Sequence, residues 1–427
     1  MSTLRAICKQ ALPRLRPDPL TKKEDHDALF VEGDPFLTQR LLLLLEEDLL
    51  SSRDKLLFSG HVGSGKSTEL YHLKRQLEGR HPRLTVIYFS VKRHVNLVGA
   101  DCGAVLEGIA GALAETAREH GLVLEDFEDR VRQARETYRR VRRRKQGWEL
   151  AARLDPDWKL ARADVSAERT SSVEDEWELV EERDAAAMAA VVNHVIAEIR
   201  RARPRADLLL LVDDLEKLDL ASARKVFQEG TAIAAIDAAT VVTIPIALLY
   251  SELAAALRTP FSLKPEVLPV VQVRGRDGAV VAEGTQRLRQ VALARVPDLD
   301  SLLSPADFER IALASGGVVR DLVRLLHELT LSVAVRIDLG GGDDPATAAE
   351  VEHSLAQRRN EFLHEVPMEL VRRMAVLHRD PDGEGGVMDG DLARLLGIAA
   401  ALEYANTERW FRVHPLAEHL IGRLHAQ

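Results

Sequence analysis

The chain has 427 residues, 46% of them hydrophobic and 29% charged, which excludes a disordered or fibrous protein. Its 58 basic and 67 acidic residues give a net charge of −9, so the overall charge does not favour nucleic acid. The two cysteines, Cys8 and Cys102, are too few for a disulfide framework or a zinc site. No segment has the ~18 consecutive apolar residues of a membrane helix, and the basic N-terminus lacks a signal-peptide core. We therefore expect a cytoplasmic protein with no membrane partner.

The N-terminal half predicts alternating helices and strands. Residues 1–34 contain three prolines and predict a loosely structured lead-in. Five elements are then expected in the order helix, strand, helix, strand, helix, at 35–50, 55–59, 67–77, 84–91 and 104–120. A turn over 51–54 separates the first helix from the first strand.

Residues 122–184 differ in composition and predict a charged helical insertion that projects from the core. The spacing of Phe127, Val131, Ala134, Tyr138 and Val141 is that of a heptad seam or a helical hairpin. A basic run over 139–145 precedes an acidic run over 174–184. Such a basic run either pairs with the acids on a solvated surface or grips the phosphates of a nucleic acid.

The rest of the chain predicts a sheet followed by helices. After a helix over 185–203, strands are expected at 207–212, 240–249 and 267–273. Strands alternating with helices indicate an α/β fold with a parallel sheet covered on both faces. Residues 299–336 predict only helix, 340–345 predict a linker, and 346–427 predict three helices and two short strands.

The strongest motif is Gly60–Ser67, GHVGSGKS, which fits the phosphate-loop pattern and lies between a predicted strand and a predicted helix. The backbone N–H groups of such a loop and the positive end of the helix bind phosphate. Lys66 is expected to hold the β- and γ-phosphates and Ser67 to hold Mg²⁺. The predicted nucleotide-binding residues are Gly60, Gly63, Ser64, Gly65, Lys66, Ser67 and Thr68.

A second motif is the apolar strand 208–212, which ends in Asp213 and Asp214. Parallel strands bring their carboxyl ends to one edge of the sheet, where the phosphate loop also lies. Asp213 is predicted to hold Mg²⁺, and Asp214 to orient the attacking water. The alternative for Asp214 is a residue that only caps a helix.

These two motifs together resemble those of AAA+ and STAND-like P-loop ATPases. Further along, SGGVVRDL at Ser315–Leu322 resembles the lid motif of origin-recognition-type members, and the tail around Leu402–Leu416 resembles the wing of a winged helix. The resemblance implies an ATPase core at 35–275, a helical lid at 285–338 and a winged helix at 346–427. It also implies that ATP and Mg²⁺ are cofactors and that Arg320 senses the γ-phosphate.

Two further residues take their roles only from the resemblance. Thr243 would be the polar sensor on the strand that follows the acidic one in the sequence, and its alternative is an ordinary strand residue. Arg258 would be an arginine finger that acts on a neighbouring subunit and so implies a homo-oligomer, and its alternative is a solvated arginine. His61 occupies a variable position of the loop and is expected to point outward.

One departure from the family pattern concerns the second acid, which is Asp214 where the family commonly has glutamate. A side chain one bond shorter lies about 1.5 Å further from the water, and such a displacement can cost about 10²-fold in rate. Glu216 could substitute for it. We therefore expect a Mg-dependent ATPase that acts as a switch or motor, or a low-turnover signalling switch.

A DNA-handling ATPase is a third possibility, because a winged helix can read DNA. Its expected recognition helix, 388–396, carries Asp389 and Asp391 against one arginine, Arg394. Acidic side chains repel phosphate, so DNA is not the favoured partner. A protein partner bound through the winged helix or the insertion is expected instead.

Overall fold

The computed structural model describes residues 3–46, 55–119, 121–144, 177–202, 207–228, 230–251, 253–257, 261, 264–380, 390–405 and 409–422. A five-stranded parallel sheet lies at its centre, with the strand order β2-β5-β6-β1-β7. The strands are β1 (Lys55–Gly60), β2 (Leu84–Ser90), β5 (Asp207–Asp213), β6 (Ala239–Thr243) and β7 (Glu266–Leu268). The predicted α/β fold with a parallel sheet is confirmed.

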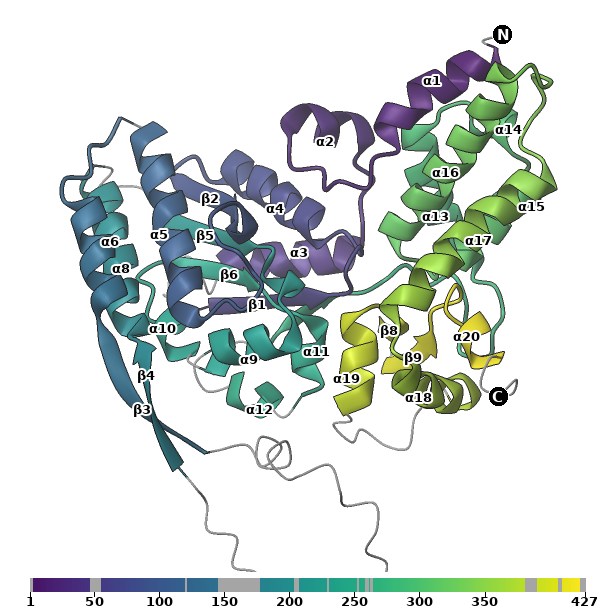
Figure 1. Cartoon of the computed structure of the whole chain (residues 1–427). Helices are drawn as coiled ribbons and strands as arrows, with labels where there is room; N and C mark the ends of the chain where they lie inside the picture. The colour runs from purple at the N-terminus through teal and green to yellow at the C-terminus, as the bar shows by residue number, and fades with distance from the viewer. Residues whose placement is uncertain are drawn as a thin grey trace, which may run out of the picture.

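Helices cover both faces of this sheet, as Figure 1 shows. Side chains alternate along β5, so Leu208, Leu210 and Val212 pack toward one group of helices, while Leu209 and Leu211 pack toward the other. The first group includes α5 (Cys102–Glu119), α8 (Ala185–Ala202) and α9 (Leu220–Gln228). The second comprises α3 (Pro35–Leu44) and α4 (Lys66–Arg80). A strand buried on both faces needs this continuous apolar sequence.

Two predicted strands are shorter than expected, and both end one or two residues before a proline. The predicted strand 240–249 ends at Thr243, and residues Ile246–Leu249 form α11 after Pro245. The predicted strand 267–273 ends at Leu268, directly before Pro269. Proline has no N–H to donate to a neighbouring strand, so the ladder stops there.

The lead-in contains regular structure, which corrects the prediction for residues 1–34. It forms α1 (Leu4–Arg14) and α2 (Lys23–Leu29). The buried residues Leu4, Ile7, Cys8 and Ala11 follow helical spacing and pack in the same core as α16 (Val319–Asp338). The N-terminal segment is therefore attached to the helices that follow the sheet.

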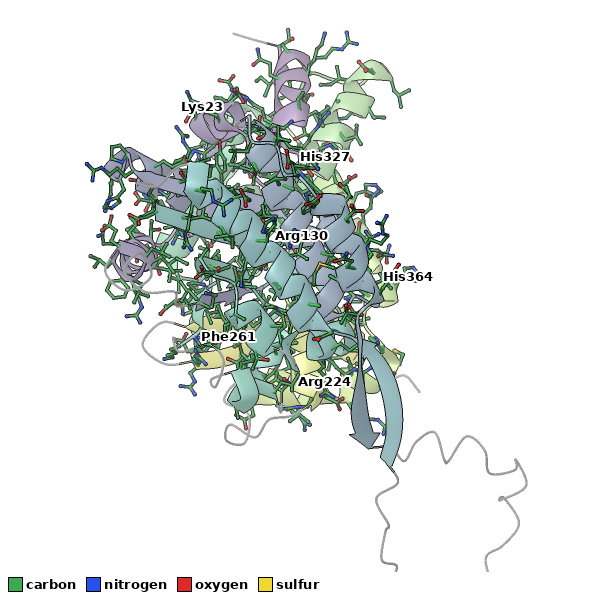
Figure 2. All side chains as sticks on the ribbon, turned by 90° about the vertical axis from the view of Figure 1, so that its left-hand side faces the viewer. Lys23, Arg130, Arg224, Phe261, His327 and His364 are labelled. Atoms are coloured by element: carbon green, nitrogen blue, oxygen red, sulfur yellow. The ribbon has the colours of Figure 1, made fainter. Side chains whose placement is uncertain are left out.

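Among its described residues, the insertion is helical only at its start. Helix α6 (Phe127–Glu136) buries Phe127, Val131 and Ala134, as the heptad spacing predicted. The chain then forms an antiparallel pair, β3 (Tyr138–Arg144) and β4 (Trp177–Arg183), so Tyr138 and Val141 lie in a strand rather than a helix. Figure 2 shows this pair projecting below the helical layer that carries Arg130.

The register of the pair gives a physical reason for this correction. Arg139, Arg140 and Arg143 lie opposite Glu182, Glu181 and Glu178. Sequences with opposite charges at facing positions favour an antiparallel pair, and Val141 is paired with Val180 in this register. The basic and acidic runs thus lie on paired strands; residues 145–176 lie outside the described part of the chain.

After the sheet come two helical regions. The lid region comprises α13 (Ala282–Arg295), α14 (Leu299–Leu302), α15 (Pro305–Ala314) and α16. The C-terminal region comprises α17 (Ala348–Glu365), α18 (Met368–Arg379), α19 (Gly390–Gly397), β8 (Ala401–Ala405), β9 (Arg409–Val413) and α20 (His419–Gly422). Among the described helices, none is long and apolar enough to span a membrane.

Candidate functional site

The phosphate loop connects β1 to α4 at the carboxyl edge of the sheet. Gly63 and Gly65 have φ values of +91° and +108°, which side chains rarely allow. A Cβ on Gly63 would lie 2.8 Å from Arg320, whereas a Cβ on Gly65 would meet nothing within 4 Å. The loop is therefore packed against the lid region at Gly63 and open at Gly65, where α4 begins. An open helix N-terminus preceded by such a loop suits an anion.

Lys66 is buried inside this loop. Its Nζ donates to the carbonyl oxygens of Gly60 and His61, both at 2.8 Å. Burial lowers the pKa of Lys66, and the nearby carboxylates of Glu216 and Asp213 oppose that change. The hydroxyl of Ser64 is buried and has no hydrogen-bond partner among the described residues. The loop thus holds a buried cation and an unused polar atom, a donor set that fits a polyphosphate.

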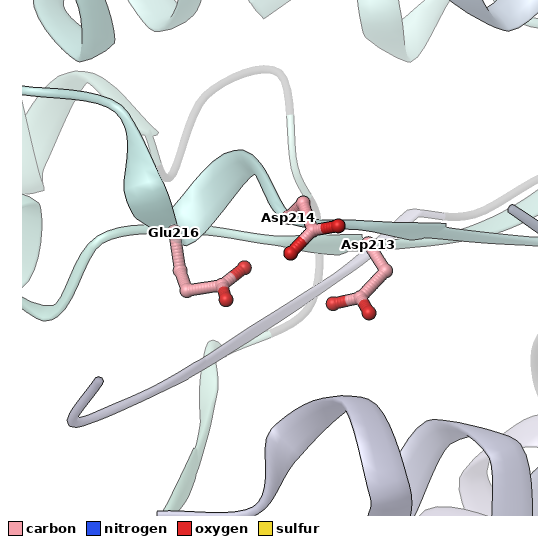
Figure 3. A group of neighbouring side chains, drawn as sticks. All are labelled: Asp213, Asp214 and Glu216. Carbon is pink, nitrogen blue, oxygen red and sulfur yellow. The ribbon is translucent and has the colours of Figure 1, made fainter. Parts of the chain in front are cut away.

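Three acids converge where β5 ends, as Figure 3 shows. Oxygen atoms of Asp213, Asp214 and Glu216 lie within 4.8 Å of one another. Asp213 accepts a hydrogen bond from Tyr88 at 2.6 Å, and Ser67 of the phosphate loop lies close enough to lower the pKa of the Asp213 carboxyl group. Its other oxygen has no partner in the described part of the chain. The motifs on β1 and β5 therefore meet in space, as the sequence predicted.

The same acids fit a divalent cation. Burial, followed by the charge of Glu216, raises the pKa of Asp213 to about 6. A hard cation such as Mg²⁺ prefers carboxylate and hydroxyl oxygens, and it would relieve the repulsion between these groups. Ser67 and Asp213, the residues that the sequence predicted as its ligands, could hold it.

Asp214 and Glu216 differ in what they contact. Both oxygens of Asp214 are occupied, one by Ser90 and one by Lys217, and Lys92 lies 3.4 Å away. Burial raises the pKa of Asp214, but the hydrogen bonds from Lys217 and Ser90 outweigh burial and lower it. Glu216 instead has a buried oxygen without a partner among the described residues. Only Glu216 of these two acids lines the cavity beside the phosphate loop.

Thr243 and Arg320 reach the same neighbourhood from different elements. The hydroxyl of Thr243, at the end of β6, accepts the N–H of Leu215 at 3.1 Å and so holds the turn between Asp214 and Glu216. The N–H of Arg320 donates to the carbonyl of Gly63 at 3.1 Å. The Arg320 side chain lines the cavity that Lys66 also lines, and burial, followed by Arg324, lowers its pKa. Arg258 lies outside the described residues.

Two adjoining cavities open beside the loop. The small cavity, of about 60 Å³, is lined by the charged and hydroxyl groups of Lys66, Ser67, Glu216 and Arg320. The large cavity, of about 400 Å³, has a mixed lining that includes Phe30, Gly33, Pro269, Arg287 and Val291. Leu20, Gly65, Thr68, Arg295 and Val319 line both cavities.

The lead-in supplies residues of this site that sequence reasoning missed. Leu20 and Phe30 line the large cavity, and the N–H of Leu20 donates to the hydroxyl of Thr68 at 3.1 Å. Thr68 thereby holds the lead-in against α4. The only sequence signal was the helical spacing of Leu4, Ile7, Cys8 and Ala11, which indicates a segment that packs on the body of the protein.

His61 points inward, which corrects the prediction that it points outward. It is 1% exposed, and its Nε2 accepts the N–H of Glu403 in β8 at 2.7 Å. In the same part of the structure, α19 packs against α11 of the core. The C-terminal region is therefore bonded to the phosphate loop.

Comparison with known proteins found no matching family model and no matching curated protein. The chain is similar to a solved structure of the Aeropyrum pernix ORC1 protein in complex with DNA. The two chains are 13% identical, with 95% of this chain and 97% of that chain covered and a TM-score of 0.44. The functional interpretation of this protein therefore depends on the site itself.

Proposed function

We propose that this protein binds Mg·ATP and hydrolyses it to ADP and phosphate. The observation that carries the proposal is that Ser67 of the phosphate loop lies close enough to Asp213, at the end of β5, to lower the pKa of that carboxyl group. Ser67 and Asp213 are 146 positions apart in the sequence, yet both lie beside the buried Lys66. Phosphate-transferring enzymes need this combination of loop, cation and metal-binding acid.

Each group has a role that its position supports. The loop N–H groups and Lys66 bind the phosphates, and Ser67 and Asp213 hold Mg²⁺. When bound, Mg²⁺ neutralises charge on the β- and γ-phosphate oxygens. The nucleoside occupies the large cavity, whose lining includes apolar side chains from the lead-in and the lid region.

Glu216 is the better candidate to activate water, and Asp214 positions the turn. In this reaction the water oxygen bonds to the γ-phosphorus, the bond from that phosphorus to the β–γ bridging oxygen breaks, and a carboxylate accepts the proton. An acceptor needs a free oxygen that faces the phosphates. Glu216 lines the small cavity and has an oxygen without a partner among the described residues, whereas both Asp214 oxygens already accept hydrogen bonds.

Arg320 and Thr243 connect this chemistry to the rest of the fold. Arg320 lines the small cavity from the lid region and is placed to contact the γ-phosphate. Thr243 acts through the turn that carries Glu216, so it is a positioning residue. Loss of the γ-phosphate would weaken the contact of the lid region with the loop, which is how a nucleotide-driven switch operates.

A low-turnover switch is the second candidate, and one observation favours it. The loop is bonded to the lid region through Gly63 and to the C-terminal region through His61. A loop held by two regions can change their positions when its ligand changes. The two candidates share the nucleotide site and differ in turnover.

The deciding experiment measures ATP binding by titration calorimetry and phosphate release with Mg²⁺, with and without DNA. We expect binding that requires Mg²⁺ and turnover that EDTA abolishes. Absence of ATP binding would refute the proposal. Molecular mass measured with ADP and with a non-hydrolysable ATP analogue tests the switch, since identical masses argue against assembly. Rates that rise with DNA would assign the C-terminal region to DNA.

A further inference from the structure

Arg295 lies where the two cavities join and belongs to none of the recognised motifs. It is the last residue of α13, only 6% exposed, and it lines both cavities together with Gly65 and Thr68. Gly65 and Thr68 flank Lys66 and Ser67 in the sequence. A cationic side chain of the lid region is therefore placed across the cavity from the start of α4.

This arginine lacks an anionic partner. Its Nη1 donates to the carbonyl of Val291, one turn earlier in the same helix, at 3.1 Å. Its Nε has no partner, and no carboxylate forms an ion pair with it in the part of the chain that the structure describes. Burial alone lowers the pKa of Arg295 to about 10, with no charged group acting on it. A guanidinium has five N–H donors, so most of its capacity is unused.

In the described part of the chain, the other buried arginine and the other arginine that lines the large cavity are both neutralised. Arg358 contacts Asp321 at 3.1 Å and also pairs with Glu361 and Glu365. Arg287, which lines the large cavity, is near Asp34 and Glu69, whose charges favour its protonated form. Burial of a charge without a partner is costly, so Arg295 is the exception that needs an explanation.

The geometry points to a phosphate as the missing partner: we propose that Arg295 binds the α- or β-phosphate of the nucleotide. This inference rests on the proposed function. The γ-phosphate end belongs to the small cavity, which Glu216 and Arg320 line and the large cavity does not share. The nucleoside belongs to the large cavity. A group at the junction faces the phosphates between them, which ATP and ADP have in common.

The test compares Arg295→Met, Arg320→Met and, as a matched control on α13, Arg289→Met. Arg289 pairs with Asp300 and stacks on Phe308, away from both cavities. Affinities for Mg·ATP, Mg·ADP and adenosine are measured by calorimetry, and the Tm of each unliganded variant by differential scanning. A charged hydrogen bond corresponds to about 10- to 100-fold in affinity.

For Arg295→Met we expect this 10- to 100-fold loss of affinity for ATP and for ADP alike, and an unchanged affinity for adenosine. The Tm of the unliganded variant should equal or exceed that of the wild type. Arg320→Met should lose affinity for ATP more than for ADP, and Arg289→Met should bind like the wild type. If the wild-type protein binds ATP and Arg295→Met binds ATP and ADP with the wild-type affinities, the inference is overturned. A Tm below that of the wild type, with unchanged affinities, would mean that Arg295 has a structural role. A loss of affinity for ATP alone would mean that Arg295 contacts the γ-phosphate. Either result overturns the inference. If the wild type itself binds no ATP, the proposed function fails.

Discussion

The two walls of the site differ in how their charged groups are partnered. On the core wall, Lys66 donates to two carbonyls and Asp214 accepts from Ser90 and Lys217. On the wall formed by the lid region, Arg295 is buried with a single carbonyl of its own helix. The core wall leaves one oxygen each of Asp213 and Glu216 without a partner but has cations beside these acids, whereas the lid wall contains a buried cation without an anionic partner among the described residues. Unpartnered charge is thus the more informative mark of the ligand.

The largest expected effect follows from removing the cation of the core wall. Lys66→Ala should weaken Mg·ATP binding about 100-fold or more, because a buried cation facing the phosphates is lost. Calorimetry measures the affinity, and Lys74→Ala is the control, since Lys74 lies on the same helix and pairs with Glu78 on the surface. Unchanged ATP affinity in Lys66→Ala would remove the loop from the site.

The next effect separates the two acids. Glu216→Gln should retain ATP binding and reduce turnover about 10²-fold or more, because a general base is lost. Asp214→Asn should reduce turnover less and lower the Tm, because its contacts with Lys217 and Lys92 weaken. Phosphate release and thermal unfolding are measured for both variants. A larger loss of turnover in Asp214→Asn would restore the role that the motif predicted for Asp214.

A third prediction concerns how the lid region docks on the core. Gly317 has a φ of +84°, and a Cβ there would lie 1.7 Å from the carbonyl oxygen of Val271. The N–H of Val271 also donates to the carbonyl of Gly317. Gly317→Ala should therefore destabilise the protein by about 3 kcal/mol or more. Gly340→Ala is the matched control, since Gly340 has φ +85° with nothing near its Cβ. Equal urea midpoints for the two variants would show that backbone strain alone matters.

The smallest effect is a pH dependence centred on His61. Burial, followed by the charge of Lys66, lowers the pKa of His61 to about 3, below the unfolded value of 6.5. The unfolded state therefore binds the proton first. The contribution of His61 to the free energy of unfolding is thus fully present above pH 6.5 and is lost as the pH falls toward 3. Between pH 6.5 and 5 this residue alone should cost about 2 kcal/mol.

His61→Gln keeps an acceptor for the N–H of Glu403 and removes the titration. Urea unfolding at pH 6.5 and pH 5 should give a smaller difference for the variant than for the wild type. Equal differences would mean that His61 becomes protonated in the folded protein without cost.

Much of the core and part of the site were predictable from local sequence. The apolar run 208–212 could only be a strand buried on both faces, and GHVGSGKS between a strand and a helix could only be read as a phosphate loop. Both depend on neighbours in the sequence. The insertion was harder to predict, because α6 follows helical spacing up to Glu136, while the seven residues of β3 pair with β4, more than 30 positions away.

The remaining site residues owe their positions to tertiary contacts. Arg295 has no motif around it, and its place at the junction depends on how the lid region packs against α4. Glu216 gained importance only once both oxygens of Asp214 were found occupied. In the lead-in, three prolines outweighed a helical pattern whose partner, α16, lies three hundred positions away.

The hydrogen bond from Glu403 to His61 has a consequence for regulation. It ties the phosphate loop to β8 of the C-terminal region, so a partner molecule that moves this region would also act on the loop. Free-energy coupling between two ligands is reciprocal, so a partner that pulls this strand away must change nucleotide affinity by the same factor with which nucleotide changes the partner's own affinity. A change in nucleotide affinity on adding the partner would thus give the change in partner affinity on adding nucleotide.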